Sequence, residues 1–289
     1  MFRNLEELVN QAREAGQPLS ALMIDHEAET SGQTREAVVA QMARRWQVMV
    51  QAARRGVAGV EARSGMTGGD AKRLWDYVKK GRTLTGSSFL TAISFALGTN
   101  EVNAAMGVIC ATPTAGSSGV LPGVLLMVQQ RLQLADEAVV QALFTAAAVG
   151  YAVANNAVIS GAQGGCQAEV GTASAMAAAA AVELAGGSPQ QCADGAAMAL
   201  KNLLGLACDP LAGLVEVPCI KRNAGGAAIA LAAADMALAG IRSQVPVDEV
   251  IAAMYQIGQA LPLSLKETAQ GGLAATPTGC KWKELLWNS

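Results

Sequence analysis

Three cysteines in the second half of the chain have the residue type and surroundings of metal ligands. Cys166, Cys208 and Cys219 lie beside or near glycine and proline, in GAQGGCQAEVG and LGLACDPLAGLVEVPCIKRNAGG. A thiol binds metal as a thiolate, and soft thiolates select zinc, copper(I) or iron-sulfur clusters. Three cysteine ligands would leave a fourth coordination position of the metal or cluster open. Zinc fingers and ferredoxins space their cysteines by roughly two to four residues. The spacing here is far wider, so by itself it favours a metal site no more than ordinary buried cysteines.

Two other segments could bind a small anion. In EARSGMTGGDAKRL, residues 61–74, glycines precede a helix predicted to begin near Asp70, so backbone amides could form an anion-binding nest. The segment is not a Walker motif, because no GK[ST] follows. Residues 100–123 combine hydroxyls, glycines and prolines, and could offer donors to a carboxylate. Each segment is also consistent with a plain structural turn.

The elements that would position these residues are predicted to be helices. Apolar residues recur at helical spacing, strand signals are few, GLVEVPC at 213–219 being the best, and there is no βαβ rhythm. The predicted fold is therefore all-α, a single domain over residues 1–289. It has N-terminal helices in 1–60 and a flexible tail at 270–289. The predicted helices cover residues 2–15, part of 18–32, 34–55, 85–98, 124–132, 136–154, 168–186, 189–204, 223–239 and 247–260.

Composition narrows the class of protein. Of 289 residues, 52% are hydrophobic, 15% charged and 4% aromatic, so alanine, glycine, leucine and valine must carry the packing. A net charge of −2 without a basic run argues against nucleic-acid binding. Six cysteines and no signal peptide at the start predict a reducing cytoplasm. The most apolar windows, 134–159 and 171–185, are predicted to be buried helices, because the first contains polar residues and the second is too short to span a membrane.

Together these motifs resemble a known family. SGMTGGDA (64–71), NAAMGVICATPTAGSSGVLPG (103–123), GAQGGCQAEVGTASAMAAAA (161–180), LGLACDPLAGLVEVPCIKRNAGGA (204–227) and GGLAATPTG (271–279) are similar to the α chain of bacterial iron-sulfur-dependent L-serine dehydratase. The resemblance covers nearly the whole chain. It implies a lyase that eliminates water from L-serine to give pyruvate and ammonia, in serine catabolism or gluconeogenic supply of pyruvate.

The resemblance also implies a cofactor and a set of site residues. A [4Fe-4S] cluster would be held by Cys166, Cys208 and Cys219, with the fourth iron left for substrate, while Cys110 and Cys192 match no ligand position and are predicted core residues. In single-chain relatives a cysteine at the extreme C-terminus caps the open iron, which makes Cys280 a candidate resting-state fourth ligand. The two nests are predicted to bind substrate beside the cluster. Their residues are Ser64, Gly65, Thr67, Gly68, Thr114, Ser117 and Ser118.

The catalytic base is not identified in this chain. The sole histidine, His26, lies in a charged amphipathic segment and is predicted to be a solvated surface residue. Family members have a second part, fused or separate, that holds a histidine-containing motif. The resemblance therefore predicts a hetero-oligomer with a β chain that supplies the base or its orienting group.

Two alternatives stay open at this point. The same cluster could act on another small β-substituted amino acid, as a cysteine desulfidase or a threonine deaminase. A protein of another class, a non-catalytic helical binding or membrane protein, would use its cysteines only for packing.

Overall fold

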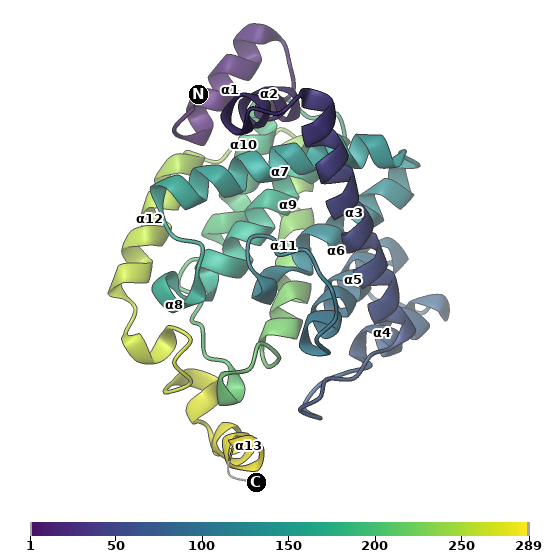
Figure 1. The fold of residues 1–289 in the computed structure, drawn as a ribbon, viewed down its shortest axis with the longest axis vertical. Coiled ribbons are helices and arrows are strands. Elements are labelled where there is room, and N and C mark those ends of the chain that lie inside the picture. The colour runs from purple at the N-terminus through teal and green to yellow at the C-terminus, as the bar shows by residue number, and fades with distance from the viewer. Residues whose placement is uncertain (1, 288–289) are drawn as a thin grey trace.

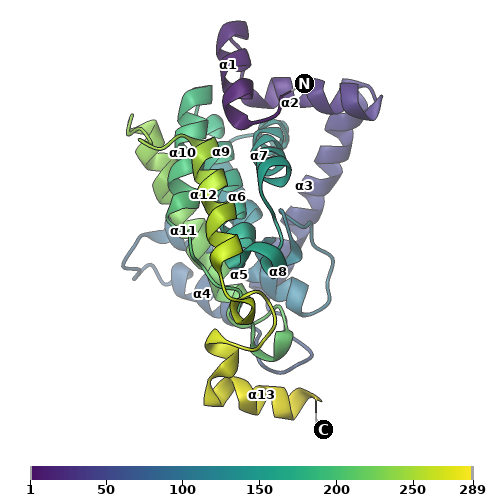
Figure 2. The same ribbon diagram turned by 90° about the vertical axis from the view of Figure 1, so that its left-hand side faces the viewer.

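The structure, a computed structural model, describes residues 2–287 and contains thirteen α-helices there. Within those residues it has no β-strand, only two isolated bridges, so the predicted all-α class is confirmed. Figures 1 and 2 show α1 and α13 at opposite ends of the molecule. The α-helices are α1 (Leu5–Ala15), α2 (Leu19–Ser31), α3 (Arg35–Ala58), α4 (Asp70–Lys79), α5 (Ser87–Ala104), α6 (Val120–Leu132), α7 (Asp136–Asn156), α8 (Gly161–Gly164), α9 (Thr172–Leu184), α10 (Pro189–Lys201), α11 (Cys219–Leu238), α12 (Val247–Ala260) and α13 (Pro277–Trp287).

The N-terminal helices begin and end at residues suited to those positions. Asn4 caps α1 by accepting from the Glu7 amide at 2.9 Å, and Gly16 ends the helix in the left-handed region. Thr34 caps α3 in the same way. α2 and α3 pack on α7 and place the N-terminal part of the chain across one side of the bundle (Figure 1).

The solvated position predicted for His26 is wrong. Its side chain is only 6% exposed, and its ring lies 4.9 Å from that of Phe2 and 5.1 Å from that of Tyr151. Tyr151 belongs to α7, so contacts distant in sequence turn this face of α2 inward. His26 is a core histidine of the N-terminal end.

The interior of the bundle is formed from alanine-rich helices. α9 packs against α7, α10 and α11, and its residues from Thr172 to Val182 are all buried. Small side chains let these helices approach closely and pack without large residues. α3 and α5 approach very closely, because a Cβ on Gly56 would lie 2.1 Å from the Gly98 carbonyl oxygen.

α7 is the one helix, among the residues described, that is long and apolar enough to cross a membrane. In its most apolar window 61% of the residues are buried inside the protein. The helix packs against α2, α3 and α9, as the core helix of a bundle would.

The loops that carry the predicted site residues lie together at the end of the bundle away from α1. We call residues 61–69, 112–119, 161–171 and 206–222 the cradle. Within it, the predicted helix start at residue 168 is replaced by a π-helical turn over Gln167–Gly171 before α9 begins. Single π-helical turns are rare and occur frequently at functional sites.

The C-terminal segment differs from the flexible tail predicted for residues 270–289. Gly272–Ala275 forms a 3-10 turn and Pro277–Trp287 forms α13. The Trp287 indole donates to the Ala212 carbonyl oxygen at 3.1 Å, and the Leu273 amide donates to Asp209 at 2.8 Å. These contacts join the tail to the cradle. Residues 288–289 of the predicted tail lie outside the described residues.

Candidate active site and metal centre

The three predicted ligand cysteines are brought together in the cradle. Cys166 precedes the π-helical turn, Cys208 lies on an irregular loop, and Cys219 is the first residue of α11. They are 2%, 3% and 7% exposed. Burial raises the pKa of Cys166 to about 11. Burial, followed by the charge of Cys166, raises the pKa of both Cys208 and Cys219. The thiols are therefore close enough to affect one another's ionisation.

Buried hydrogen bonds fix the backbone that carries these thiols. Gln167 is fully buried, and its amide donates to Gly164 and Met254 carbonyl oxygens, both at 2.9 Å, and accepts from the Gly205 amide. Two backbone hydrogen bonds fix Cys208. Its amide donates to the Leu265 carbonyl oxygen, and its carbonyl oxygen accepts from the Glu267 amide. Loops from three parts of the chain are thereby joined around the cysteines.

Arg222 supplies the positive charge of this region. Its guanidinium donates to the Ala207 carbonyl oxygen at 2.7 Å and to Asp209 Oδ1 at 2.8 Å. Its charge favours thiolate at Cys166, although burial outweighs it in the pKa of that thiol. A cation beside buried thiols lowers the free energy of their ionised form.

This donor set fits an iron-sulfur cluster. A four-iron cluster binds one thiolate on each iron atom, so its cysteines surround the cluster without meeting at one point. Three buried thiols that affect one another's pKa suit that arrangement.

A carboxylate faces the thiols. Glu169, on the π-helical turn, accepts from the Thr114 hydroxyl at 2.7 Å, and its other oxygen lies 3.9 Å from Cys208 Sγ. Burial raises the pKa of Glu169. Gly161 allows this close approach, because a Cβ there would lie 2.5 Å from Glu169 Oε2 and 3.0 Å from Cys208 Sγ.

A second buried carboxylate holds the turn of residues 61–69. The hydroxyls of Ser64 and Thr67 donate to the same oxygen of Glu216, at 2.7 and 2.6 Å. Glu216 is 5% exposed and lies between Cys208 and Cys219 in sequence. Gly65 and Gly68 have φ of 73° and 140°, in the region that favours glycine, and give the turn its shape.

Two of the predicted hydroxyls of the second nest are more buried than those of Ser64 and Thr67. Ser117 and Ser118 are fully buried; Ser117 donates to the Thr112 carbonyl oxygen at 3.1 Å, and Ser118 lies 3.4 Å from the Asn100 amide. Their hydroxyls shape the loop from inside. Thr114 alone, of the predicted residues in this second nest, contacts Glu169.

Four further residues connect the cradle, and no motif in the sequence marks them as site residues. Each is a polar or charged side chain inside a glycine- or apolar-rich run. That contrast is the one sequence feature that could have marked these residues as site residues. Asn223 illustrates their role, because it accepts from the Gly119 amide at 2.8 Å and donates to Gly116 and Cys219 carbonyl oxygens at 2.7 and 2.8 Å. The four are Glu169, Glu216, Arg222 and Asn223.

Comparison with known proteins shows the family of the chain. The serine dehydratase alpha chain family matches residues 14–274. A protein of Bacillus subtilis named "Probable L-serine dehydratase, alpha chain" is 58% identical over 279 residues, 96% of this chain and 93% of its own length. The "L-serine dehydratase, alpha chain" of Peptoniphilus asaccharolyticus is 39% identical over 97% of both chains.

A longer relative shows a different organisation. The protein of Streptomyces coelicolor named "L-serine dehydratase" is 38% identical over 289 residues, which are 96% of this chain but 62% of its own length. That relative therefore carries a further segment which this chain does not match.

Proposed function

Because the chain belongs to the serine dehydratase alpha chain family, we propose that it is the α chain of an L-serine dehydratase, a lyase that converts L-serine to pyruvate and ammonia. The observation that carries the proposal is the 58% identity to a protein of that name over almost the full length of both chains. The three buried thiols of the cradle give the proposed reaction a chemical basis.

We further propose that Cys166, Cys208 and Cys219 hold a [4Fe-4S] cluster. When bound, the cluster supplies a Lewis acid for the departure of the serine hydroxyl, which is otherwise a poor leaving group. The chain surrounds that position with buried residues, which limits access of water. Arg222 favours the thiolate form of Cys166. The pair of Glu169 and Thr114 presents a carboxylate and a hydroxyl to the same space.

Substrate orientation is assigned to the two nests. Ser64, Thr67 and Thr114 bring hydroxyl donors to the cradle, and Gly65 leaves the backbone of its turn uncovered, because a Cβ there would meet nothing within 4 Å. In the structure, Ser64 and Thr67 donate to the Glu216 carboxylate, which has the same chemistry as the substrate carboxylate. If these residues bind serine, Ser64→Ala and Thr67→Ala each raise the KM for serine; an unchanged KM in both would remove them from the site.

The base that takes the Cα proton is proposed to come from a β chain. The only histidine, His26, packs between Phe2 and Tyr151 in the N-terminal part of the molecule, and Ser64 and Glu216 lie in the cradle at the other end. Relatives named alpha chain and the longer single-chain relative support a two-part enzyme. Full turnover by the purified α chain alone would refute this assignment. We place the complex in the cytoplasm, where cysteines stay reduced.

Cys280 is a candidate fourth ligand when no substrate is present. It is exposed in the first turn of α13. α13 packs on residues 211–213, which lie between Cys208 and Cys219 in the sequence. The spectrum of the cluster in Cys280→Ser without serine tests this assignment. An unchanged spectrum means that Cys280 does not bind iron.

The decisive experiment is anaerobic purification followed by iron, sulfide and pyruvate assays. We expect a brown protein with about four iron atoms per chain that bleaches in air and loses activity in parallel. Cys208→Ser is expected to lose iron, whereas Cys192→Ser is the matched control. A colourless but active wild-type protein would overturn the cofactor and leave the reaction standing.

Comparison of kcat/KM for L-serine, L-threonine and L-cysteine distinguishes serine dehydration from the two alternative reactions, threonine deamination and cysteine desulfidation. We expect serine to have the highest value. No pyruvate from serine, with the β chain present and iron restored, would overturn the proposed function itself.

A further inference from the structure

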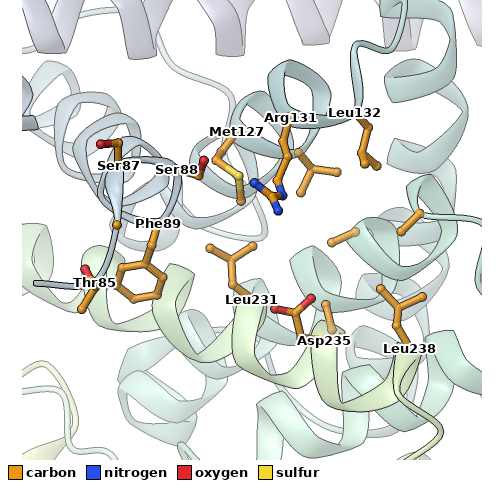
Figure 3. A pocket seen from close by; sticks show the side chains of 15 residues that line it. Thr85, Ser87, Ser88, Phe89, Met127, Arg131, Leu132, Leu231, Asp235 and Leu238 are labelled. Carbon is orange, nitrogen blue, oxygen red and sulfur yellow. The ribbon is translucent and has the colours of Figure 1, made fainter. Parts of the chain in front are cut away.

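A cleft lies at the end of the bundle away from the cradle. It is formed by the beginning of α5 and the last turns of α6, α9 and α11, and has a volume of ≈ 430 Å³ (Figure 3). This volume lies within the range of small-molecule pockets. α11 begins at Cys219 in the cradle and reaches the cleft at Leu231, so twelve residues of one helix, about 18 Å, separate the two.

Two opposite charges face each other across this cleft. Figure 3 shows the guanidinium of Arg131, on α6, and the carboxylate of Asp235, on α11, both directed into the space. Both residues are exposed, and across residues 2–287 neither side chain makes an ion pair, with the other or with any neighbour. The positive charge of Arg131, in the last turn of α6, interacts favourably with the helix dipole. That interaction does not require the guanidinium to point into the cleft.

The beginning of α5 adds donors beside Arg131. Gly86 precedes the helix and offers no capping side chain, so the first amides of α5 have no side-chain acceptor. The hydroxyls of Ser87 and Ser88 line the same wall. Free amides at a helix N-terminus together with a guanidinium favour a carboxylate.

The rest of the cleft is apolar. Its surface between the charged walls comes from aliphatic, aromatic and methionine side chains of four helices, with no further acid or base among them. They are Phe89, Met127, Val128, Leu132, Ala181, Ala185, Leu231, Ala234 and Leu238. A ligand with an apolar body buries surface here, which is favourable by about 25 cal/mol per Å².

A single ligand class meets all three features. A carboxylate matches Arg131 and the amides of α5, an ammonium group matches Asp235, and an apolar side chain matches the floor. A polyanion is disfavoured by Asp235, and glycine or serine would leave the floor uncovered. We propose that this cleft binds an α-amino acid with an aliphatic or aromatic side chain, at a site separate from the cradle.

Isothermal titration calorimetry of the full chain, together with any partner that copurifies, tests the proposal with L-leucine and L-phenylalanine. We expect one of them to bind with a Kd of about 1 mM or tighter. Analogues that lack one feature should bind at least about 10-fold more weakly. These are 4-methylpentanoate without the ammonium group, L-leucinamide without the carboxylate, and glycine without the apolar body. No saturable binding of either amino acid at about 10 mM would overturn the proposal.

Variants locate the binding. Arg131→Gln and Asp235→Asn are each expected to raise the Kd about 10-fold, because each removes one charge contact. Arg13→Gln, an exposed arginine on α1, and Ser64→Ala in the cradle should leave it unchanged. An unaltered Kd in both cleft variants would place the amino acid elsewhere and overturn the assignment. The analogue series on the wild-type protein stays decisive if a variant fails to fold. The readout is binding, so it succeeds or fails independently of serine turnover.

Discussion

The alanine-rich interior and the cradle are built from the same chain on opposite physical principles. In the interior, α9 is buried on every side by α7, α10 and α11, and apolar contact is nearly its only interaction. In the cradle, buried carboxylates, hydroxyls and thiols contact one another between loops from four parts of the sequence. Packing in the interior fixes the positions of the helix ends. The cradle loops at those ends carry the carboxylates, hydroxyls and thiols.

The distribution of unsatisfied polar atoms sharpens this difference. Among residues 2–287, four buried side-chain atoms have neither a hydrogen-bond nor an ion-pair partner. Thr112 Oγ1 belongs to the cradle, and Asn100 Oδ1 borders it, because the Asn100 amide donates to the Ala115 and Gly116 carbonyl oxygens. A buried polar atom without a partner is costly and is tolerated mainly where function requires it. Two of the four atoms thus lie in or beside the cradle, and a third, Thr172 Oγ1, lies at the start of the interior helix α9.

Gly56→Ala tests the interior and has the largest expected effect on stability. The new Cβ would lie 2.1 Å from the Gly98 carbonyl oxygen, so α3 and α5 must separate. We expect a loss of about 3 kcal/mol in the free energy of unfolding. Chemical denaturation measures it, and Gly225→Ala is the matched control, because Gly225 also lies inside a helix, α11, but its Cβ would meet nothing within 4 Å. A loss below that of the control would show that the interior is not tightly packed.

Glu216→Ala tests the cradle. Ser64 and Thr67 lose their shared acceptor, and a hydrogen bond to a charged group contributes roughly 1.5–3 kcal/mol. We expect amide exchange in residues 61–69 to accelerate at least about 10-fold while exchange in α9 is unchanged. Hydrogen-exchange mass spectrometry measures both. Glu14→Ala, at an exposed position of α1, is the control. Equal acceleration in α9 would mean that the two regions unfold as one unit.

Cys192→Ala separates packing cysteines from cradle cysteines. Cys192 is fully buried in α10, away from the cradle, where it acts as a small apolar residue. We expect a loss of about 1 kcal/mol in unfolding free energy and an unchanged iron content. Thermal unfolding and iron analysis measure the two effects. Loss of iron in this variant would contradict the division between the regions.

Local sequence pattern predicted the interior better than the cradle. The helix predicted over 247–260 is observed as Val247–Ala260, because its apolar spacing and flanking proline are local signals. α11 begins at Cys219, four residues before the predicted start, since Pro218 precedes its first turn. The burial of His26 and the order of α13 depend on partners far away in the chain, Tyr151 and Ala212, which no local pattern reveals.

The same distinction applies to the site. The motifs predicted that the three cysteines and the two nests form one site, because a family resemblance is encoded residue by residue, and the structure places these segments together in the cradle. The partners of those residues were not predicted. Glu216 reaches Ser64 and Glu169 reaches Thr114 only in the folded chain, and a lone glutamate in an apolar run has no spacing from which its partner can be inferred.

Asp70→Asn gives the smallest effect and tests the exposed edge of the cradle. Asp70 pairs with Lys221 of α11 and with Arg73, and its pKa is lowered: burial opposes ionisation, but these two cations outweigh it. An aspartate with a lowered pKa in the folded protein stabilises it above the unfolded pKa of about 3.9, and that contribution disappears as pH falls through the lower folded value.

We therefore expect Asp70→Asn to lower the unfolding free energy by about 0.5 kcal/mol at pH 7, a small value because Lys221 is more than half exposed and screened by water. The deficit should shrink with added salt and vanish in acid, as measured by urea unfolding across pH and ionic strength. A loss as large as that of Glu216→Ala would contradict the comparison. It would mean that an exposed ion pair, and not the buried carboxylate, holds the turn of residues 61–69 against α11.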